Sequence, residues 1–277
     1  MSPSSDSHTT SRVIRWQDGQ RSELVDTLAV EEPLEIRLGY RDPRKGRTHR
    51  SVAITMRTPG DDLALALGFL FNESILDRYA AIQTIEQSAD NVVRVELHDT
   101  AVFDPLRLER NFYVTSSCGV CGKSSLESLS TAGFVALTDD GFRIPLALLQ
   151  ELPAQLATQQ ELFRLTGGNH ATALFHGNGQ ITRVTEDVGR HNAMDKLVGH
   201  CLQDNLLPLA QHGILVSGRA SFELMQKTLA ARCPLLVAIG APSSLAVELA
   251  QEYNLTLVGF LNRNRCNIYN GGFRLTE

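Results

Sequence analysis

Long hydrophobic runs are missing from this sequence. The longest run, from Leu63 to Phe71, is far shorter than the ~18 residues or more that a membrane-spanning helix requires. The stretch from Met1 to Arg12 is polar and rich in serine and threonine, and it has no apolar segment of the kind found in a secretory signal. We therefore expect a cytoplasmic protein that does not enter the membrane.

A surplus of basic residues is also missing. The 277 residues include 26 Lys and Arg against 31 Asp and Glu, which gives a net charge of −5. Without a basic field the chain has no general means of holding nucleic acid, so any anion must be bound by local groups. With 43% hydrophobic residues, the length allows one large domain or two smaller ones.

Cysteine is scarce, and its odd number argues against a framework of disulfides. Of the five cysteines, Cys201, Cys233 and Cys266 stand alone, and we expect them to be small buried hydrophobic residues. Cys118 and Cys121 are spaced as a CxxC motif. This pair is the sharpest chemical feature of the sequence.

The pattern of the first half predicts a small N-terminal α+β domain over residues 31–140, preceded by a flexible tail over residues 1–30. A helix opens after Thr58-Pro-Gly-Asp61, where Thr58 or Asp61 can cap it. A second, short helix is expected to start near Ser124. The expected strands are Leu34–Tyr40, Ser51–Arg57, Asn91–His98 and Asn111–Thr115.

The second half, residues 141–277, alternates short apolar strands with helices. This alternation predicts a mostly parallel sheet covered on both faces, which is a three-layer α/β/α domain. Residues 143–165 are helical by pattern, with Pro145 and Pro153 suited to the first turns of two successive helices. The other expected helices cover 190–202, 221–232 and 244–253, and the expected strands cover 171–175, 181–185, 214–217, 235–239 and 256–261.

The CxxC motif favours a nucleophilic sulfur. Glycines flank Cys118 and Cys121, and Lys123 and the expected helix at Ser124 can lower a thiol pKa and expose the thiolate. A persulfide carrier needs an accessible sulfur of this kind, and the second cysteine can release the terminal sulfur or tune the first. A dithiol oxidoreductase and a cofactor-binding chaperone without thiol chemistry remain as alternatives. We expect no zinc, because one cysteine pair lacks a second pair and no histidine has glutamate two residues later.

Glycine, arginine and histidine recur where strands of the second half meet helices or loops. These places are 166–170, 186–192, 217–221 and 240–244, and they include Arg190 and Arg219. Ligands of α/β sheets bind beyond the strand ends, glycines let backbone amides approach phosphate, and arginine binds phosphate through two hydrogen bonds. The pattern therefore predicts a site for a phosphorylated or nucleotide-like ligand. The segment Phe260-Leu261-Asn262-Arg263-Asn264-Arg265 is either a further part of that site or a solvated turn.

Taken together, these motifs resemble the FdhD family, the sulfur-carrier accessory proteins of formate dehydrogenase. The resemblance rests on T-S-S-C-G-V-C-G-K at 115–123, T-G-G-N-H-A at 166–171, E-D-V-G-R-H-N-A-M-D-K at 186–196, S-G-R-A-S-F-E-L-M-Q-K at 217–227 and T-L-V-G-F at 256–260. It implies a C-terminal domain similar to cytidine deaminases, without their zinc chemistry, and a homodimer.

The resemblance also implies a role. A cysteine desulfurase passes sulfur to the CxxC, and the carrier, a sulfurtransferase-type protein, delivers it to the molybdenum or tungsten bis(guanine dinucleotide) cofactor that formate dehydrogenase needs. By motif, Cys118 matches the persulfide cysteine and Cys121 matches its partner. Phe260 to Arg265 matches the cofactor-binding segment, so GDP should bind as a mimic of the cofactor's nucleotide end.

Overall fold

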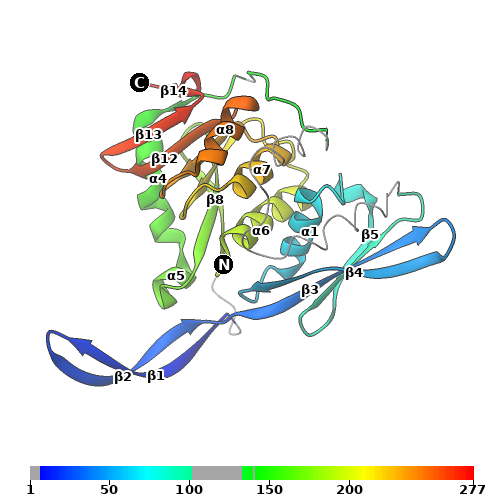
Figure 1. Ribbon diagram of the computed structural model, residues 1–277, viewed down its shortest axis with the longest axis horizontal. Helices are drawn as coiled ribbons and strands as arrows, with labels where there is room; N and C mark the ends of the chain where they lie inside the picture. Colours follow the sequence, from blue (N-terminus) through cyan, green and yellow to red (C-terminus); the bar gives the residue numbers. More distant parts are fainter. Residues whose placement is uncertain (1–6, 102–132, 140) are drawn as a thin grey trace.

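Among the described residues, a four-stranded sheet, a six-stranded sheet and a short two-stranded parallel sheet make up the body together with their covering helices, and a separate two-stranded hairpin projects from it (Figure 1). The computed structural model describes residues 7–101, 133–139 and 141–277. The expected strand at 111–115, the expected helix at 124 and the CxxC motif lie outside these residues. No helix of the described part combines the length and the apolar character that a membrane crossing requires.

In the described part of the N-terminal unit, helix α1 packs on the inner face of a four-stranded sheet of order β4-β3-β6-β5. Leu34, Ile36 and Leu38 alternate along β3 and meet Leu65 and Leu67 of α1 in a core cluster. The expected strands at 34–40, 51–57 and 91–98 and the helix after Asp61 are confirmed, and β5 was not predicted. The elements are β3 (Glu32–Asp42), β4 (Gly46–Arg57), α1 (Asp62–Asn72), the short 3-10 helix η1 (Tyr79–Ala81), β5 (Ile82–Ala89) and β6 (Val92–Leu97).

The C-terminal unit is built on a six-stranded sheet of order β13-β12-β11-β10-β8-β9. Only the β10–β11 and β11–β12 pairs are parallel, so the prediction of a mostly parallel sheet is wrong. The connection from β8 to β9 is too short for a crossover, and such a connection joins antiparallel strands. The elements are β7 (Ile144–Pro145), α4 (Leu146–Gln159), α5 (Glu161–Thr166), β8 (His170–His176), β9 (Ile181–Asp187), α6 (Arg190–Gln203), β10 (His212–Val216), α7 (Phe222–Ala230), β11 (Leu235–Ala238), α8 (Ser244–Glu252), β12 (Thr256–Asn262), β13 (Arg265–Asn270), the 3-10 helix η2 (Gly272–Arg274) and β14 (Leu275–Thr276).

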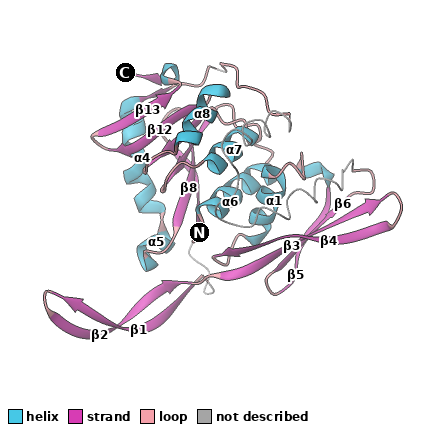
Figure 2. Cartoon of the chain, viewed as in Figure 1, coloured by secondary structure: helices cyan, strands magenta, loops and turns pink. Residues whose placement is uncertain are grey.

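Helices cover both faces of this sheet, as predicted for a three-layer domain (Figure 2). On one face Leu149, Leu152 and Leu156 of α4 pack in a cluster with side chains of β8, β10, β11 and β12. On the other face α6, α7 and α8 share a larger cluster with the opposite side chains of the same strands. These three leucines follow the helical repeat on both sides of Pro153, and α4 continues through this proline. Pro153 therefore does not start a second helix.

The two units meet at a close crossing of α1 and α6. A Cβ atom on Gly68 of α1 would clash with the backbone oxygen of Asp195, and one on Gly199 of α6 would clash with the backbone oxygen of Ala64. Glycine at both positions therefore lets the backbones approach closely. Asp61 precedes α1 with a left-handed φ of 56° and makes no side-chain cap, so the predicted capping roles of Thr58 and Asp61 are wrong.

Residues 8–29 form a long hairpin, which we call the arm. Its strands β1 (His8–Gln17) and β2 (Gln20–Ala29) pair antiparallel along their whole length. Asp18 and Gly19 at the turn both have positive φ, as a tight hairpin turn requires. The sequence predicts a flexible tail here, whereas the structure has regular strands that stand away from the body (Figure 1).

Candidate functional site

The motif loops of the C-terminal half gather at one edge of the six-stranded sheet. Gly240 N donates to Gly218 O at 3.0 Å, and Phe260 N donates to Gly240 O at 3.0 Å. Ser217 Oγ accepts from Ala171 N at 2.9 Å, which joins the third loop to the first. The prediction from the sequence that these loops meet is therefore confirmed.

Arg190 lies at this edge as the first residue of α6. Its Nε atom is buried and has no hydrogen-bond partner among the described residues. Burial first, and then the charges of Arg190 and His191, lower the pKa of the neighbouring His170, so its imidazole is neutral at pH 7. A guanidinium beside a neutral imidazole at the start of a fourteen-residue helix suits a phosphate group.

His191 and Glu223 connect this edge to α7. His191 Nε2 lies 2.7 Å from Glu223 Oε2 and 3.4 Å from Ser221 Oγ. The hydrogen bond from His191 holds the pKa of Glu223 below its ordinary value, so this carboxylate stays ionised at neutral pH. Ser221 also caps α7 by accepting from Leu224 N. The S-G-R-A-S-F-E motif therefore supplies Ser221 as the cap of α7 and Glu223 as the charged partner of His191.

Arg219 belongs to the same edge, whereas Arg263 lies elsewhere. Arg219 is exposed in the loop whose backbone meets Gly240. Arg263 Nε lies 3.5 Å from Glu151 Oε1 of α4, in the helical layer opposite to α6. The prediction that Arg190, Arg219, Arg263 and Arg265 gather at one place is therefore wrong for Arg263, because β12 runs on past the edge as part of a hairpin.

That hairpin accounts for most of the segment Phe260 to Arg265. Asn262 Oδ1 accepts from Asn264 N at 3.0 Å and from Arg265 N at 3.1 Å, which closes the turn from β12 to β13. The side chain of Leu261 is in the core, so only its backbone could contact a ligand. Phe260 is partly exposed beside the edge with a left-handed φ of 54°. Of the six residues, Phe260 is the one that a backbone hydrogen bond ties directly to the loop edge.

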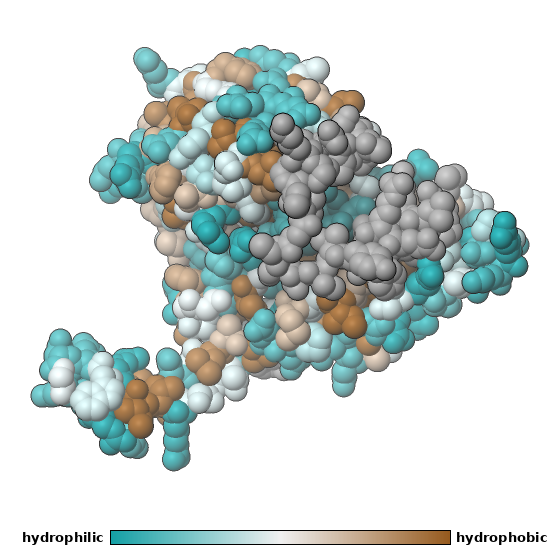
Figure 3. All heavy atoms as spheres, in the orientation of Figure 1, coloured by the Kyte–Doolittle hydropathy of each residue, from teal (hydrophilic) through white to brown (hydrophobic). Residues whose placement is uncertain are grey.

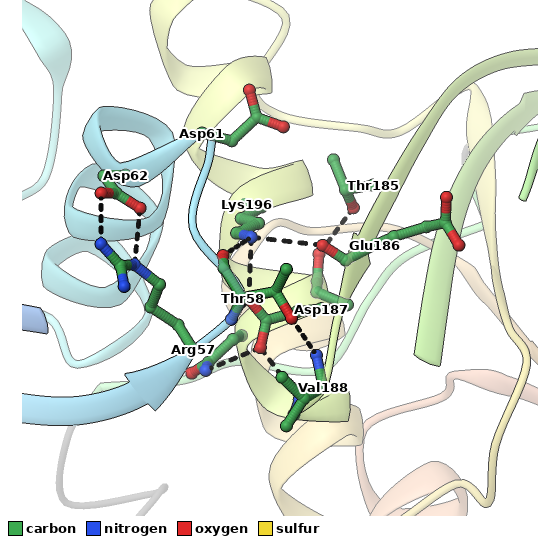
Figure 4. A network of polar contacts seen from close by, with 12 residues as sticks. Arg57, Thr58, Asp61, Asp62, Thr185, Glu186, Asp187, Val188 and Lys196 are labelled. Carbon is green, nitrogen blue, oxygen red and sulfur yellow. Dashed lines mark hydrogen bonds and ion pairs between the residues drawn. The ribbon is translucent and has the colours of Figure 1, made fainter. Parts of the chain in front are cut away.

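A buried ion pair under the edge holds the turn from Asp187 to His191 in place (Figure 4). Lys196 Nζ lies 2.8 Å from Asp187 Oδ2, and the two side chains are 2% and 0% exposed. Asp187 also accepts from Gly189 N at 2.9 Å and from Asn192 Nδ2 at 3.0 Å. Because neighbouring groups satisfy both charges, the pair can fix the backbone that presents Arg190 without leaving an isolated charge.

Thr58 completes this network from the other unit. Its hydroxyl oxygen accepts from Val188 N at 3.1 Å and from Asn169 Nδ2 at 3.0 Å. Its backbone N donates to Asp187 Oδ2 at 3.2 Å, and its backbone O accepts from Lys196 Nζ at 3.0 Å. The connection between β4 and α1, which contains Thr58, thus links the N-terminal unit to this network (Figure 4). Sequence reasoning assigned Thr58 only to a cap and gave Asn169 and Lys196 no role.

A second buried cluster lies where α1, α6 and α7 meet. Lys227 Nζ lies 2.7 Å from Asp195 Oδ1 and 3.9 Å from Glu73 Oε1. Burial first, and then the charge of Asp195, raises the pKa of Glu73 above its ordinary value. Two carboxylates share one ammonium group here, so one of them is held closer to its neutral form.

The three cysteines of the described residues do not offer a reactive thiolate. Burial raises the pKa of Cys201 to about 12 and also raises the pKa of Cys266. Cys233 is buried, and its Sγ donates to His212 O at 3.2 Å. A thiolate is the nucleophilic form of cysteine, so these three thiols do not suit nucleophilic sulfur chemistry, and the assignment of such chemistry to Cys118 and Cys121 stays a prediction.

Metal-binding clusters are also missing from the described part of the chain. There, no three His, Cys, Asp or Glu side chains are placed to hold a metal ion. Cys118 and Cys121 lie outside these residues, so the expected absence of zinc stays a prediction.

Comparison with known proteins shows the family to which this fold and these motifs belong. The model of the FdhD/NarQ family matches residues 29–276. The chain belongs to this family. A protein named sulfur carrier protein FdhD from Streptomyces avermitilis is 48% identical over 274 residues, which cover 95% of this chain and 94% of that protein. A protein of the same name from Mycolicibacterium paratuberculosis is 45% identical over 273 residues, covering 95% and 97%.

A solved structure supports the fold in three dimensions. It is a crystal structure of a protein from Desulfotalea psychrophila that carries the provisional description of a formate dehydrogenase accessory protein. The two chains superpose with a TM-score of 0.74 over 97% of this chain and 99% of the other, at 22% sequence identity. The family and the mixed α/β fold expected from the sequence are therefore confirmed, whereas the likeness to cytidine deaminases stays a prediction.

Proposed function

We propose that this protein is a cytoplasmic sulfur carrier for the maturation of formate dehydrogenase. The observation that carries the proposal is the near full-length similarity to relatives that bear the name sulfur carrier protein. The pKa values of Cys201 and Cys266 and the burial of Cys233 support the assignment of the carried sulfur to Cys118, with Cys121 as its partner.

In the proposed cycle, the Cys118 thiolate attacks the terminal sulfur of a cysteine desulfurase persulfide. A new S–S bond forms on Cys118, the S–S bond of the desulfurase breaks, and its thiolate leaves. Cys121 then attacks Cys118 Sγ, and the terminal sulfur leaves as sulfide toward the metal while a Cys118–Cys121 disulfide forms. The two thiols supply the two electrons that convert the carried sulfur to sulfide, and a cellular thiol reductant restores them.

The acceptor in this proposal is the molybdenum or tungsten bis(guanine dinucleotide) cofactor, which is the substrate of the carrier. Arg190, whose buried Nε has no partner among the described residues, and the exposed Arg219 are the groups that fit a phosphate at the loop edge. Arg263 and Arg265, on the β12–β13 hairpin, would reach a more distant part of such a large ligand. GDP is the probe that isolates the nucleotide end.

Activation of formate dehydrogenase tests the proposal. Cells or extracts that lack this carrier should yield active enzyme when they are given the wild-type protein and inactive enzyme when they are given Cys118→Ala. Cys201→Ala is the matched control, because its thiol is buried and not ionised. If Cys118→Ala activated formate dehydrogenase as fully as the wild-type protein does, the persulfide could not be assigned to Cys118. That result would favour a chaperone role that needs no thiol.

The dithiol oxidoreductase remains the second candidate function, because it uses the same two cysteines. It predicts reduction of a disulfide substrate without any gain of sulfur on the protein. Mass measurement of the protein after incubation with desulfurase and cysteine distinguishes the two functions.

A further inference from the structure

Two histidines lie directly opposite each other at one end of the six-stranded sheet. His176 ends β8 and His212 begins β10, and the antiparallel ladder pairs the two residues. Opposite side chains of such a pair share a face of the sheet and lie within contact distance. The ring centroids are 4.4 Å apart, and the rings are tilted by 36°. Both residues are partly exposed, so a solute can reach the pair.

Neither imidazole of the pair has a hydrogen-bond or ion-pair partner in the described part of the chain. Three other histidines, His49, His191 and His200, each lie against a carboxylate. Nδ1 of His212 is buried and has no partner among these residues, although buried polar atoms nearly always have one. Burial first, and then the charge of His176, lowers the pKa of His212 below its ordinary value. The His212 ring is therefore neutral at pH 7, with a lone pair available for a ligand.

Hydrogen bonds hold the backbone in place at both histidines. His176 O accepts from Gly179 N at 2.9 Å in the turn to β9. His212 N donates to Leu209 O at 3.1 Å, and His212 O accepts from Cys233 Sγ at 3.2 Å. The two rings can therefore move only by rotation of their side chains. Because the backbone is already ordered, a ligand that binds both rings loses little affinity to ordering the protein.

The ligand that suits two imidazoles is a transition-metal cation. Hard cations such as Mg²⁺ and Ca²⁺ take oxygen ligands, and the histidine–carboxylate pairs of the described residues all involve other histidines. Imidazole suits Cu²⁺, Ni²⁺ and Zn²⁺, and for a given set of ligands Cu²⁺ binds most tightly. Metal–nitrogen bonds are about 2.0–2.1 Å long, so two nitrogens that share one ion lie within about 4 Å of each other. Rings whose centroids are 4.4 Å apart can meet this condition after small side-chain rotations.

We propose that His176 and His212 form a two-histidine site for a divalent transition-metal cation, and that Cu²⁺ is the ion it holds most tightly. The described part of the chain places no third His, Cys, Asp or Glu ligand there, so water completes the coordination of the ion. An ion with two protein ligands exchanges with solvent, unlike the four-ligand zinc of a structural site. The bound ion joins the end of β8 to the start of β10 and stabilises the folded state by mass action.

This site is separate from the proposed sulfur transfer. His170, at the loop edge, begins β8, whereas His176 ends the same strand six residues later. An extended strand of that length spans about 20 Å. A metal ion at the pair therefore touches none of the residues assigned to the ligand of the carrier, and either proposal can fail without the other.

Electron paramagnetic resonance of the full, untagged chain titrated with CuCl₂ tests the proposal. Cys118→Ala/Cys121→Ala serves as the parent protein, because the thiols of the CxxC motif would themselves bind copper. The surface drawn in Figure 3 is largely hydrophilic, and exposed carboxylates hold Cu²⁺ weakly through oxygen. Nitrogen hyperfine coupling distinguishes imidazole ligands from this background. We expect one Cu²⁺ per chain, coupled to two nitrogens.

Loss of either histidine should remove the chelate. We expect His176→Gln and His212→Gln each to weaken copper binding about tenfold or more, because removal of a group that only supports a metal ligand already has an effect of that size. The double variant should lose little beyond either single one, since one imidazole cannot chelate. His98→Gln is the matched control, because His98 is exposed on the N-terminal unit, outside the pair.

Thermal unfolding supplies the second measurement. Midpoints without copper show whether each variant folds. Added CuCl₂ should raise the midpoint of the parent and of His98→Gln, and should leave those of His176→Gln and His212→Gln unchanged.

Absence of nitrogen-ligated copper in the parent protein would overturn the proposal, and the buried Nδ1 of His212 would then be a site for water. Equal copper affinity in the parent and in both single variants would overturn it as well. A loss in His98→Gln as large as that in His212→Gln would place the copper on dispersed histidines rather than on this pair.

Discussion

Lys196 of α6 and Asp187 at the end of β9 form an ion pair of 2.8 Å that is closed to solvent. The pair is satisfied from both units, since Thr58 donates its backbone N to Asp187 and accepts from Lys196 through its backbone O. Asp187 also accepts from Gly189 N, the residue just before Arg190 at the start of α6. The position of Arg190, and with it the proposed anion site, therefore depends on two buried charges beneath the surface.

Lys196→Met should destabilise the protein by about 3–5 kcal/mol, because it leaves the carboxylate of Asp187 buried without its counter-charge. Urea unfolding followed by circular dichroism measures the loss. Lys45→Met, at the exposed turn between β3 and β4, is the control and should change stability by less than about 0.5 kcal/mol. A loss below about 1 kcal/mol for Lys196→Met would mean that the pair contributes little.

Thr58→Val and Thr58→Ser separate the hydroxyl group from the shape of the side chain. Valine removes the acceptor for Val188 N and Asn169 Nδ2, and unsatisfied buried donors cost about 1–3 kcal/mol each. Thr58→Ser retains the acceptor and should keep most of the stability. We also expect weaker GDP binding only in Thr58→Val, because the Val188 amide belongs to the turn that ends at Arg190. Equal unfolding midpoints for the two variants would contradict this reading.

Glu73 should make stability depend on pH in the acid range. Burial raises its folded-state pKa above its unfolded value, so the folded protein binds the extra proton. Its contribution to stability is therefore lost as the pH rises through the folded pKa, starting from about 4.5. Glu73→Gln should gain stability relative to wild type between pH 4.5 and pH 7. Glu86→Gln, on the exposed strand β5, serves as the control, and parallel pH profiles for wild type and Glu73→Gln would refute the assignment.

Guanine nucleotide binding should depend on Arg190. A charge-assisted hydrogen bond to phosphate contributes about 1.5–3 kcal/mol, so Arg190→Met should weaken GDP binding by about tenfold or more. Calorimetry with GDP and ADP measures both affinity and base preference, and GDP should bind more tightly. Arg263→Ala tests the hairpin, and we expect a smaller loss there because Arg263 faces Glu151. Equal binding of GDP and ADP would contradict the preference for guanine, and an unchanged affinity for GDP in Arg190→Met would show that the nucleotide binds elsewhere.

The elements with a clear hydrophobic period were predictable from the sequence. The alternation of Leu34, Ile36 and Leu38 indicated β3, and Gly167 ended α5 as expected. The arm was missed because its strands carry polar side chains on an exposed hairpin. A signal was present, however, since Asp18-Gly19 is a typical two-residue hairpin turn. β13 was missed for a similar reason, because it is a polar edge strand.

The candidate site was predictable only in part. Glycine and arginine at strand ends indicated an edge where loops meet, and the structure confirms that meeting. The buried partners Thr58, Asp187 and Lys196 were not predicted, since isolated polar residues usually indicate a solvated surface. Thr58 is more than a hundred positions from both Asp187 and Lys196, and no local pattern encodes contacts over that distance.

Sulfur loading tests the central claim most directly. The purified protein is incubated with a cysteine desulfurase and cysteine, and its intact mass is measured before and after a thiol reductant is added. Wild type and Cys201→Ala should gain one sulfur atom, about 32 Da, as a persulfide that the reductant removes, and Cys118→Ala should gain none. No gain in wild type, or an equal gain in Cys118→Ala, would contradict the account of this protein as a carrier of sulfur on Cys118.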